Sequence, residues 1–171
     1  MDAIELASVD SEQWRALQGD EPHPWGGGQA EQLSWAEKQR YVGVQGEDGE
    51  LLATGGVLVA EVSAGGGEPF RVVGIGGVIV RPDMRGQGLA RIVVAAILEM
   101  GRGLGPAHAM LFCREPLVPL YERFDFRTID ASVSAAQPGG RIEMQMRSMW
   151  APLRGDASWP DGPVEVLGEP F

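Results

Sequence analysis

Residues 78–90, VIVRPDMRGQGLA, combine glycine and arginine at a spacing that could bind an anion. Pro82 ends an apolar run, and Gly86 and Gly88 permit a positive φ and a close approach of a ligand to the backbone. A helix is expected to follow, and the N–H groups of its first turn have no acceptor within the helix. Together with the helix dipole and the guanidinium of Arg85, such N–H groups bind phosphate. The pattern therefore predicts a phosphate-binding turn.

Two common phosphate-binding loops do not fit this turn. A Walker A loop needs Gly-Lys-Ser/Thr, and the chain has Gln87-Gly88-Leu89 instead. A dinucleotide-binding fingerprint needs Gly or Ala at the position of Arg91. A plain strand–turn–helix junction, in which the glycines only reverse the chain, also accounts for the segment.

The elements around the turn follow from hydrophobic patterning and turn residues. An apolar helix over 89–100 is expected after the turn. The expected strands are 4–9, 40–45, 51–62, 70–80, 107–113, 127–134 and 141–149, and the other expected helices are 11–18, 29–37 and 117–124. This order predicts an α/β (α+β) fold in which helices flank one mixed sheet.

Composition narrows the function classes. The net charge of −10 argues against nucleic acids and anionic membranes as partners, and residues 1–70 alone carry thirteen acidic and three basic side chains. No apolar run is long enough to span a membrane, and no secretory signal is visible, so a cytoplasmic location is expected. One cysteine and two histidines far apart in sequence predict no metal site. The only lysine is Lys38, against thirteen arginines, a bias attributed here to base composition.

The turn and a second motif together resemble the GNAT superfamily of acetyl-CoA-dependent N-acetyltransferases. The segment from Val80 through Ala90 is similar to the family's Val-x-Pro strand end followed by Arg/Gln-x-x-Gly-x-Gly/Ala. The segment from Leu120 to Phe126 is similar to its Leu-Tyr-x-x-x-Gly-Phe helix, with Asp125 in place of glycine. Because Asp tolerates the left-handed conformation better than most residues, we expect this turn to be kept.

The resemblance implies a GNAT-like mixed, mostly antiparallel sheet that is split by a V-shaped gap between two strands. It implies one acyl-CoA-binding domain over residues 1–150, followed by an acidic, Pro/Gly-rich tail over 151–171. It also implies acetyl-CoA as co-substrate, without a metal. The backbone expected to pair with the pantetheine arm is that of Val78, Ile79 and Val80, and the residues expected to hold the pyrophosphate are Arg85, Gly86, Gln87, Gly88, Leu89 and Ala90.

The resemblance further implies that a primary amine attacks the thioester directly. Tyr121 matches the family's proton donor to the CoA thiolate, although a tyrosine that only packs the short helix also explains it. Many relatives carry a glutamate where Gly76 stands, so the general base is not evident. Glu61, at the end of a neighbouring strand, is the acid to test first, and an exposed strand-end carboxylate is the plainer interpretation.

The N-terminal region carries the clues to the acceptor. In the family this region often lines the acceptor site. It contains Trp14, Trp25 and Trp35, which are interpreted either as core residues or, for one or two of them, as contacts to the substrate. Its acidity favours a cationic small molecule as acceptor. A weaker resemblance to aminoglycoside 2′-N-acetyltransferases rests on the loop, the Leu-Tyr helix and the acidic tail. The sequence also leaves open a homodimer, a CoA-binding regulatory or degenerate GNAT domain without turnover, and an interaction module that kept only the fold.

Overall fold

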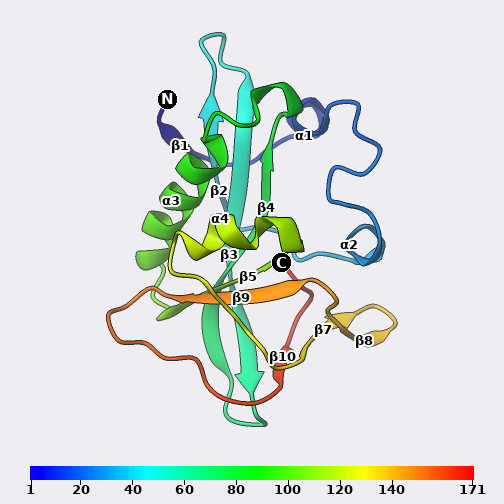
Figure 1. Cartoon of the computed structure of the whole chain (residues 1–171), viewed down its shortest axis with the longest axis vertical. Helices are drawn as coiled ribbons and strands as arrows, with labels where there is room; N and C mark the ends of the chain where they lie inside the picture. Colours follow the sequence, from blue (N-terminus) through cyan, green and yellow to red (C-terminus); the bar gives the residue numbers. More distant parts are fainter.

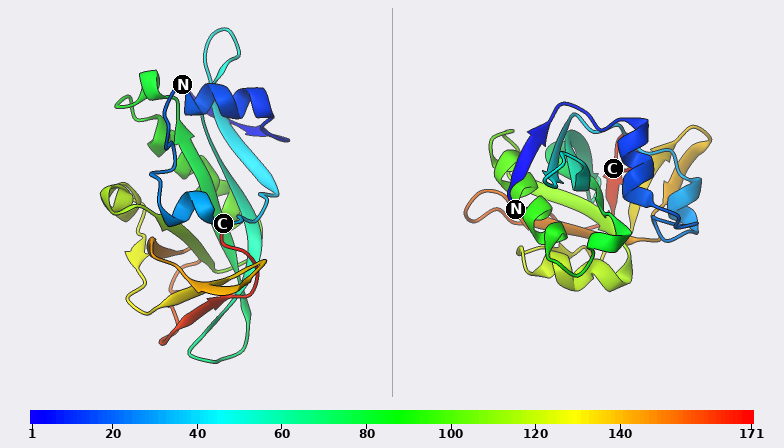
Figure 2. Two further views of the ribbon diagram at one scale, coloured as in Figure 1. Left: turned by 90° about the vertical axis from the view of Figure 1, so that its right-hand side faces the viewer. Right: turned by 90° about the horizontal axis from the view of Figure 1, so that it is seen from above.

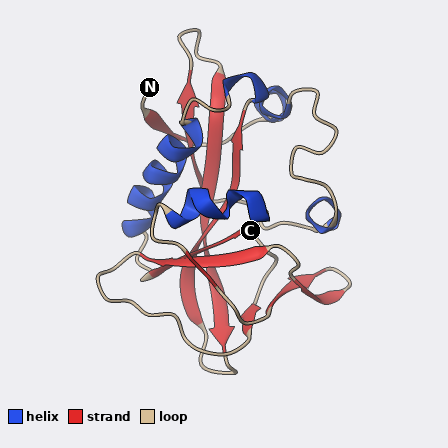
Figure 3. Ribbon diagram, viewed as in Figure 1, coloured by secondary structure: helices blue, strands red, loops and turns tan.

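The computed structural model describes residues 1–171, which form one curved ten-stranded sheet with helices on both faces (Figure 1, Figure 3). The strand order is β6-β9-β5-β4-β3-β10-β7-β8. Strand β2 also pairs with β3, and β1 pairs with β2. No helix is both long and apolar enough to cross a membrane. The strands are β1 (Ala3–Leu6), β2 (Arg40–Gln45), β3 (Leu51–Ala64), β4 (Phe70–Val80), β5 (His108–Cys113), β6 (Arg127–Thr128), β7 (Val133–Gln137), β8 (Gly140–Glu143), β9 (Arg147–Pro152) and β10 (Val164–Val166).

The α-helices are α1 (Ser11–Gln18), α2 (Gln29–Gln32), α3 (Leu89–Arg102) and α4 (Val118–Glu122). Asp10 caps α1, because its carboxylate accepts from the N–H groups of Glu12 and Gln13. Seen from above, α1 and α3 lie on opposite sides of the central strands (Figure 2). Strand β3 supports both, because Leu51 packs with Leu17 of α1 whereas Leu52 belongs to the core beneath α3.

Strands β2, β3 and β4 form an antiparallel series, with ranges close to those expected from the sequence. Helix α3 approaches this series closely at Gly55. A Cβ placed on Gly55 would lie 2.7 Å from Cδ1 of Ile97 and 3.0 Å from a methyl of Val93. The missing side chain therefore lets the apolar helix pack directly onto β3, and the start of α3 is fixed relative to the end of β4.

The V-shaped gap expected from the family resemblance lies between β4 and β5. These parallel strands pair only from Val73 to Ile75 on β4 and from Ala109 to Leu111 on β5. Beyond Ile75, β4 continues to pair with β3 but has lost its partner on the other edge. A bulge lies at this point, where the β3–β4 register shifts and Gly77 has φ +64°. The backbone of residues 76–80 therefore faces an opening on its β5 side.

Three expectations about single elements are wrong. The helix expected over 29–37 ends at Gln32, because Ser34 N–H donates to Gln137 and Ala36 N–H donates to the Pro170 carbonyl. The strand expected over 127–134 is divided into β6 and β7, and the one expected over 141–149 into β8 and β9. In both cases the chain changes its pairing partner, and such long-range pairing is not visible in a local pattern.

Residues 151–171, predicted as a tail, contribute to the sheet. They contain the end of β9, a loop and β10, which pairs with β3 on one side and with β7 on the other. Trp159 of the loop stacks on Trp150 at a centroid distance of 5.6 Å. Phe171 is 2% exposed and its ring lies over Gly74, so this segment packs against the middle of β4.

Asp125 gives a test of the turn after α4. It is the only non-glycine residue with a positive φ, +64°, in the place where the family motif has glycine. We expect Asp125→Val to lower the free energy of unfolding by about 1–3 kcal/mol, because a branched side chain is strained there. Asp125→Gly, the matched control, is expected to keep the stability of the wild type. Urea unfolding measures both, and equal stability of the two variants would contradict the assignment of strain.

Candidate acyl-CoA and acceptor site

The turn between β4 and α3 presents a row of unpaired backbone N–H groups. Gly88 is the N-cap of α3 in the left-handed conformation, and Gly86 also has a positive φ of +78°. No N–H from Gly86 to Ala90 donates to another backbone group of the turn. A Cβ placed on either glycine would meet nothing within 4 Å, so the turn is open to solvent. Such a row at the start of a 14-residue helix fits a phosphate group.

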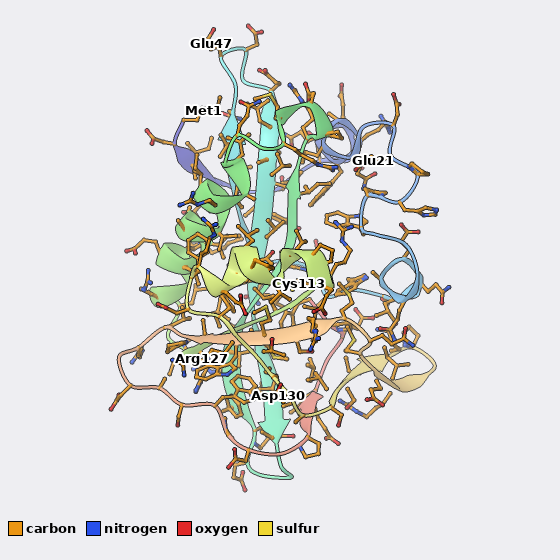
Figure 4. All side chains as sticks on the ribbon, viewed as in Figure 1. Met1, Glu21, Glu47, Cys113, Arg127 and Asp130 are labelled. Atoms are coloured by element: carbon orange, nitrogen blue, oxygen red, sulfur yellow. The ribbon has the colours of Figure 1, made fainter.

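The Arg85 guanidinium, predicted to bind phosphate, is paired with Glu21 from the N-terminal loop. Its two terminal nitrogens lie 2.6 and 2.7 Å from the two carboxylate oxygens, and Nε donates to the Val80 carbonyl. The hydrogen bonds and charge of Arg85 lower the pKa of Glu21, and the same pair raises the pKa of Arg85. Glu21 lies at the outer part of the loop that leads from α1 to α2 (Figure 4). The pair therefore fastens this loop to the turn.

A cavity of about 540 Å³ lies where β4 and β5 separate. Strand β4 contributes Ile75 through Val78, and β5 contributes Phe112 and Cys113. Cys113 lies close to the centre of the molecule, below α4 (Figure 4). The opposite wall comes from α1, from the segment that leads to β2, and from the last residue of the chain. The other lining residues are Trp14, Pro22, Pro24, Trp25, Ala30, Glu31, Leu33, Trp35, Ala36, Glu37, Lys38, Tyr41, Arg114, Leu117, Tyr121, Met146 and Phe171.

Aromatic side chains dominate the wall opposite the gap. Trp14 makes edge contacts with Trp25 at a centroid distance of 6.1 Å and with Tyr41 at 6.3 Å. Trp35 contacts Phe112, which contacts Phe171 at 5.3 Å. All three tryptophans expected near the acceptor site therefore line the cavity, and their geometry suits an apolar or aromatic ligand body.

Four charged side chains also line the cavity: Glu31, Glu37, Lys38 and Arg114. The Glu31 carboxylate is held by His23 Nδ1 at 2.9 Å and by the Gly27 N–H at 3.2 Å. Lys38 differs from the other three because it is half-buried and they are exposed, and it forms no ion pair. Burial lowers the pKa of its ammonium to about 8.

Tyr121 comes from α4 and is 5% exposed, with its side chain on the cavity wall. Its ring packs edge-on against Phe126 at 5.8 Å. Burial, followed by the nearby Cys113, raises the pKa of the phenol. At neutral pH the hydroxyl therefore keeps its proton and can donate it. Tyr121 is thus both packed in the core and placed at the gap.

The other predicted site residues lie as follows. Val78 lines the cavity and, like Val80, packs against the core under α3, whereas the side chain of Ile79 packs beneath α1. Glu61 pairs with Arg71 across the β3–β4 ladder, is exposed, and is not among the cavity residues. Cys113 is buried, and burial raises its pKa to about 12, so the thiol is protonated at neutral pH.

Sequence reasoning gave no role to Lys38 and Tyr41, and both line the cavity. Lys38 had a usable signal, because it is the only lysine in a chain that otherwise uses arginine. Tyr41 had a weaker one, being one of only two tyrosines. Phe171 belongs to the acidic tail that the weaker resemblance singled out, and the structure places it against Gly74 and Gly76 of β4.

Comparison with known proteins points to one family. Residues 12–129, more than two thirds of the chain, match the model of the acetyltransferase (GNAT) domain family. No curated protein matches the chain. The resemblance to aminoglycoside 2′-N-acetyltransferases stays a prediction.

Several solved structures share the fold. A GNAT family N-acetyltransferase (YhbS) from Escherichia coli, in complex with CoA, is 24% identical over 76% of this chain and 68% of that one, with a TM-score of 0.56. A protein described as an acyl-CoA N-acyltransferase from Klebsiella pneumoniae is 18% identical over 89% and 97%, with a TM-score of 0.60. Eis1 from Mycobacterium abscessus is 25% identical over 78% of this chain, with a TM-score of 0.56, and the match spans 32% of that longer protein.

Replacing Lys38 tests the cost of its buried charge. A folded-state pKa of about 8, below the ordinary value of about 10.4, means that the native state releases its proton first as the pH rises. The charge therefore destabilises the fold fully below pH 8, and this cost disappears between about pH 8 and 10.4. We expect Lys38→Met to be more stable than the wild type at pH 7 and its advantage to shrink over that window. Urea unfolding at pH 7, 8.5 and 10 measures the difference.

Lys38→Arg is the matched control for this prediction, because it keeps a positive charge at every pH used. We expect it to gain no stability at pH 7. An advantage of Lys38→Met that stays constant with pH would contradict the buried-charge assignment and would indicate a packing effect alone.

Proposed function

This chain belongs to the GNAT family of acetyltransferases, and we propose that it transfers an acetyl or other short acyl group from CoA to the primary amine of a cationic small molecule. The observation that carries the proposal is the gap between β4 and β5. The gap joins an aromatic cavity at Ile75–Val78 to the end of β4, where the row of free N–H groups begins. A long ligand with a phosphate end and a reactive end matches that arrangement.

The chain's own groups fit CoA on two counts. The free N–H groups of Gly86 through Ala90 and the dipole of α3 suit the pyrophosphate. The β5-facing edge of residues 76–80 offers unpaired backbone groups to the amides of the pantetheine arm, as a neighbouring strand would. The structural neighbour from Escherichia coli was crystallised with CoA, which supports the same assignment for this chain.

Arg85 has a smaller part in this proposal than the sequence suggested. Its guanidinium is already satisfied by both oxygens of Glu21 and by the Val80 carbonyl. In the proposed complex, Arg85 holds the N-terminal loop against the turn, and the backbone N–H groups bind the phosphates.

Tyr121 is proposed as the proton donor to the departing CoA thiolate. Its raised pKa keeps the phenol protonated, and its place on the wall beside Cys113 and Leu117 puts it on the β5 side of the gap. The amine nitrogen of the acceptor would form the new C–N bond as the C–S bond breaks. A donor that acts only at this step lowers the barrier without affecting the binding of acetyl-CoA.

The acceptor is proposed to be an amine with an apolar or aromatic body. Trp14, Trp25 and Tyr41 provide flat apolar surface, and Glu31 and Glu37 place negative charge on the same wall. The acidic N-terminal part adds a long-range attraction for cations that salt would weaken. A cationic amine with an aromatic ring satisfies both features.

A CoA-binding domain without turnover is the second candidate. Two observations favour it: Gly76 stands where many relatives carry a glutamate, and Glu61 does not reach the cavity. Both candidates require CoA binding, and only the first requires thiol release in the presence of an amine.

Binding of acetyl-CoA is testable by thermal unfolding. A hundredfold excess over Kd stabilises the fold by about 2.7 kcal/mol, which corresponds to roughly 5–10 °C in Tm for a domain of this size. We expect this shift in the wild type and its loss in Gly88→Val, because the side chain would point into the phosphate-binding turn. Gly105→Val is the matched control, since Gly105 also has a positive φ and open space but lies at the other end of α3. A wild type without a shift would sink both candidates.

The role of Tyr121 is testable with 2-phenylethylamine, an aromatic primary amine, as probe. We expect release of the CoA thiol with this amine and none with 2-phenylethanol, which lacks the nucleophile. Tyr121→Phe is expected to lower turnover about a hundredfold or more, with the thermal shift by acetyl-CoA kept. If Tyr121→Phe loses turnover and the thermal shift to the same extent, Tyr121 serves only to pack the site and is not the proton donor. A wild type that binds acetyl-CoA but releases no thiol with this amine, with spermidine or with amino sugars would favour the domain without turnover.

A further inference from the structure

Lys38 lies in a channel formed by glycines of two neighbouring strands. A Cβ placed on Gly56 of β3 would lie 2.8 Å from both Cβ and Cγ of Lys38. A Cβ placed on Gly76 of β4 would lie 2.7 Å from Cε and 3.2 Å from Nζ. The side chain therefore runs across the sheet from β3 to β4, in space that a side chain at either position would fill.

The end of this channel is the point where the strands separate. Gly76 is the first residue of β4 beyond Ile75, the last one paired with β5. Lys38 and Gly76 both line the cavity, so the amine stands on the cavity wall next to the opening of the gap. In the proposed complex this is the place where the reactive end of acetyl-CoA emerges.

The amine has few partners that would hold its proton. Nζ donates to the Ala36 carbonyl at 2.9 Å and forms no ion pair. Gly56 and Gly76 lie beneath it, β4 adds Ile75 and Val78 to the cavity wall, and β2 adds Tyr41. The cavity's other charged side chains are Glu31, Glu37 and Arg114. The carboxyl carbon of Phe171 faces the amine at Gly76, where a placed Cβ would lie 2.7 Å from it and 3.2 Å from Nζ. Burial lowers the pKa of Lys38 to about 8, so about half of the molecules carry a neutral amine at that pH.

We propose that Lys38 is an internal acyl acceptor, which the chain acetylates from its own bound acetyl-CoA when no external amine occupies the cavity. The neutral Nζ attacks the thioester carbonyl carbon, the new C–N bond forms, and the C–S bond breaks. The proton lost from nitrogen leaves with the CoA thiolate, so the products are an amide and free CoA. This inference rests on the proposed function, because it requires acetyl-CoA in the gap.

The product would change the acceptor cavity. An amide is not a leaving group under these conditions, so the acetyl group stays on Lys38 and is not passed to an acceptor. It removes the positive charge of Lys38 and adds bulk at Gly76, where the acceptor amine has to approach. Self-acetylation would therefore reduce turnover in a protein that holds acetyl-CoA without acceptor.

The single lysine makes the experiment unambiguous. The folded wild type is incubated with acetyl-CoA alone, and intact mass and peptide mass locate the acetyl groups, while a thermal shift reports acetyl-CoA binding in the same samples. We expect one acetyl group on Lys38, formed faster than on the Met1 amine and faster than on the chain unfolded in urea. The rate is expected to rise about tenfold from pH 7 to pH 9, with a midpoint near 8, whereas an ordinary lysine would gain about a hundredfold.

Two variants serve as controls. Gly88→Val, which is expected to lose acetyl-CoA binding, should leave Lys38 unmodified, and Lys38→Arg should bind acetyl-CoA and gain no acetyl group. Binding without modification of Lys38, or modification no faster than in urea, overturns the inference and leaves the proposed function standing. A wild type with neither thermal shift nor acetylation overturns both.

Discussion

The site depends on the end of one hydrogen-bond ladder. Strands β4 and β5 pair over three residues and then separate after Ile75, and the bulge at Gly77 turns the outer part of β4 away from its former partner. An isolated strand edge would be an aggregation hazard, but here helices and the N-terminal loop surround it. The same separation supplies unpaired backbone groups, a cavity and a direct path to the turn before α3.

Glycines make room for the segments that enclose this gap. Gly55 admits α3 on one face of the sheet, and Gly74 admits the ring of Phe171 on the other. Gly56 and Gly76 leave the channel that Lys38 occupies. Each glycine in a strand costs stability, because it loses more backbone entropy on folding than other residues. Their concentration on β3 and β4 is explained by the segments that pack closely onto both faces of these strands.

Local sequence predicted what local interactions decide. The ranges of β2, β3 and β4 and the positive φ of Asp125 follow from a few adjacent residues. The turn with Gly86 and Gly88 was found in the same way. What could not be predicted depends on contacts between distant segments: the division of the strands after residue 127, the pairing of β10 inside the sheet, and the presence of Lys38 at Gly76. Pairing of this kind joins segments that are far apart in the sequence, and it stabilises the fold only after long loops close. The hydrophobic pattern of a single segment therefore does not reveal it.

Charge links the two halves of the site. Glu21 takes up both terminal nitrogens of Arg85, so the turn before α3 presents backbone N–H groups instead of a free guanidinium. The same ion pair tethers the loop that carries Pro22, Pro24 and Trp25 onto the cavity wall. The position of the aromatic wall is therefore coupled to the turn through a partly exposed pair, whose strength falls with salt. Because backbone N–H groups serve the turn, Arg85 remains available to hold this loop, and a side chain beside the turn thereby fixes the position of the cavity wall.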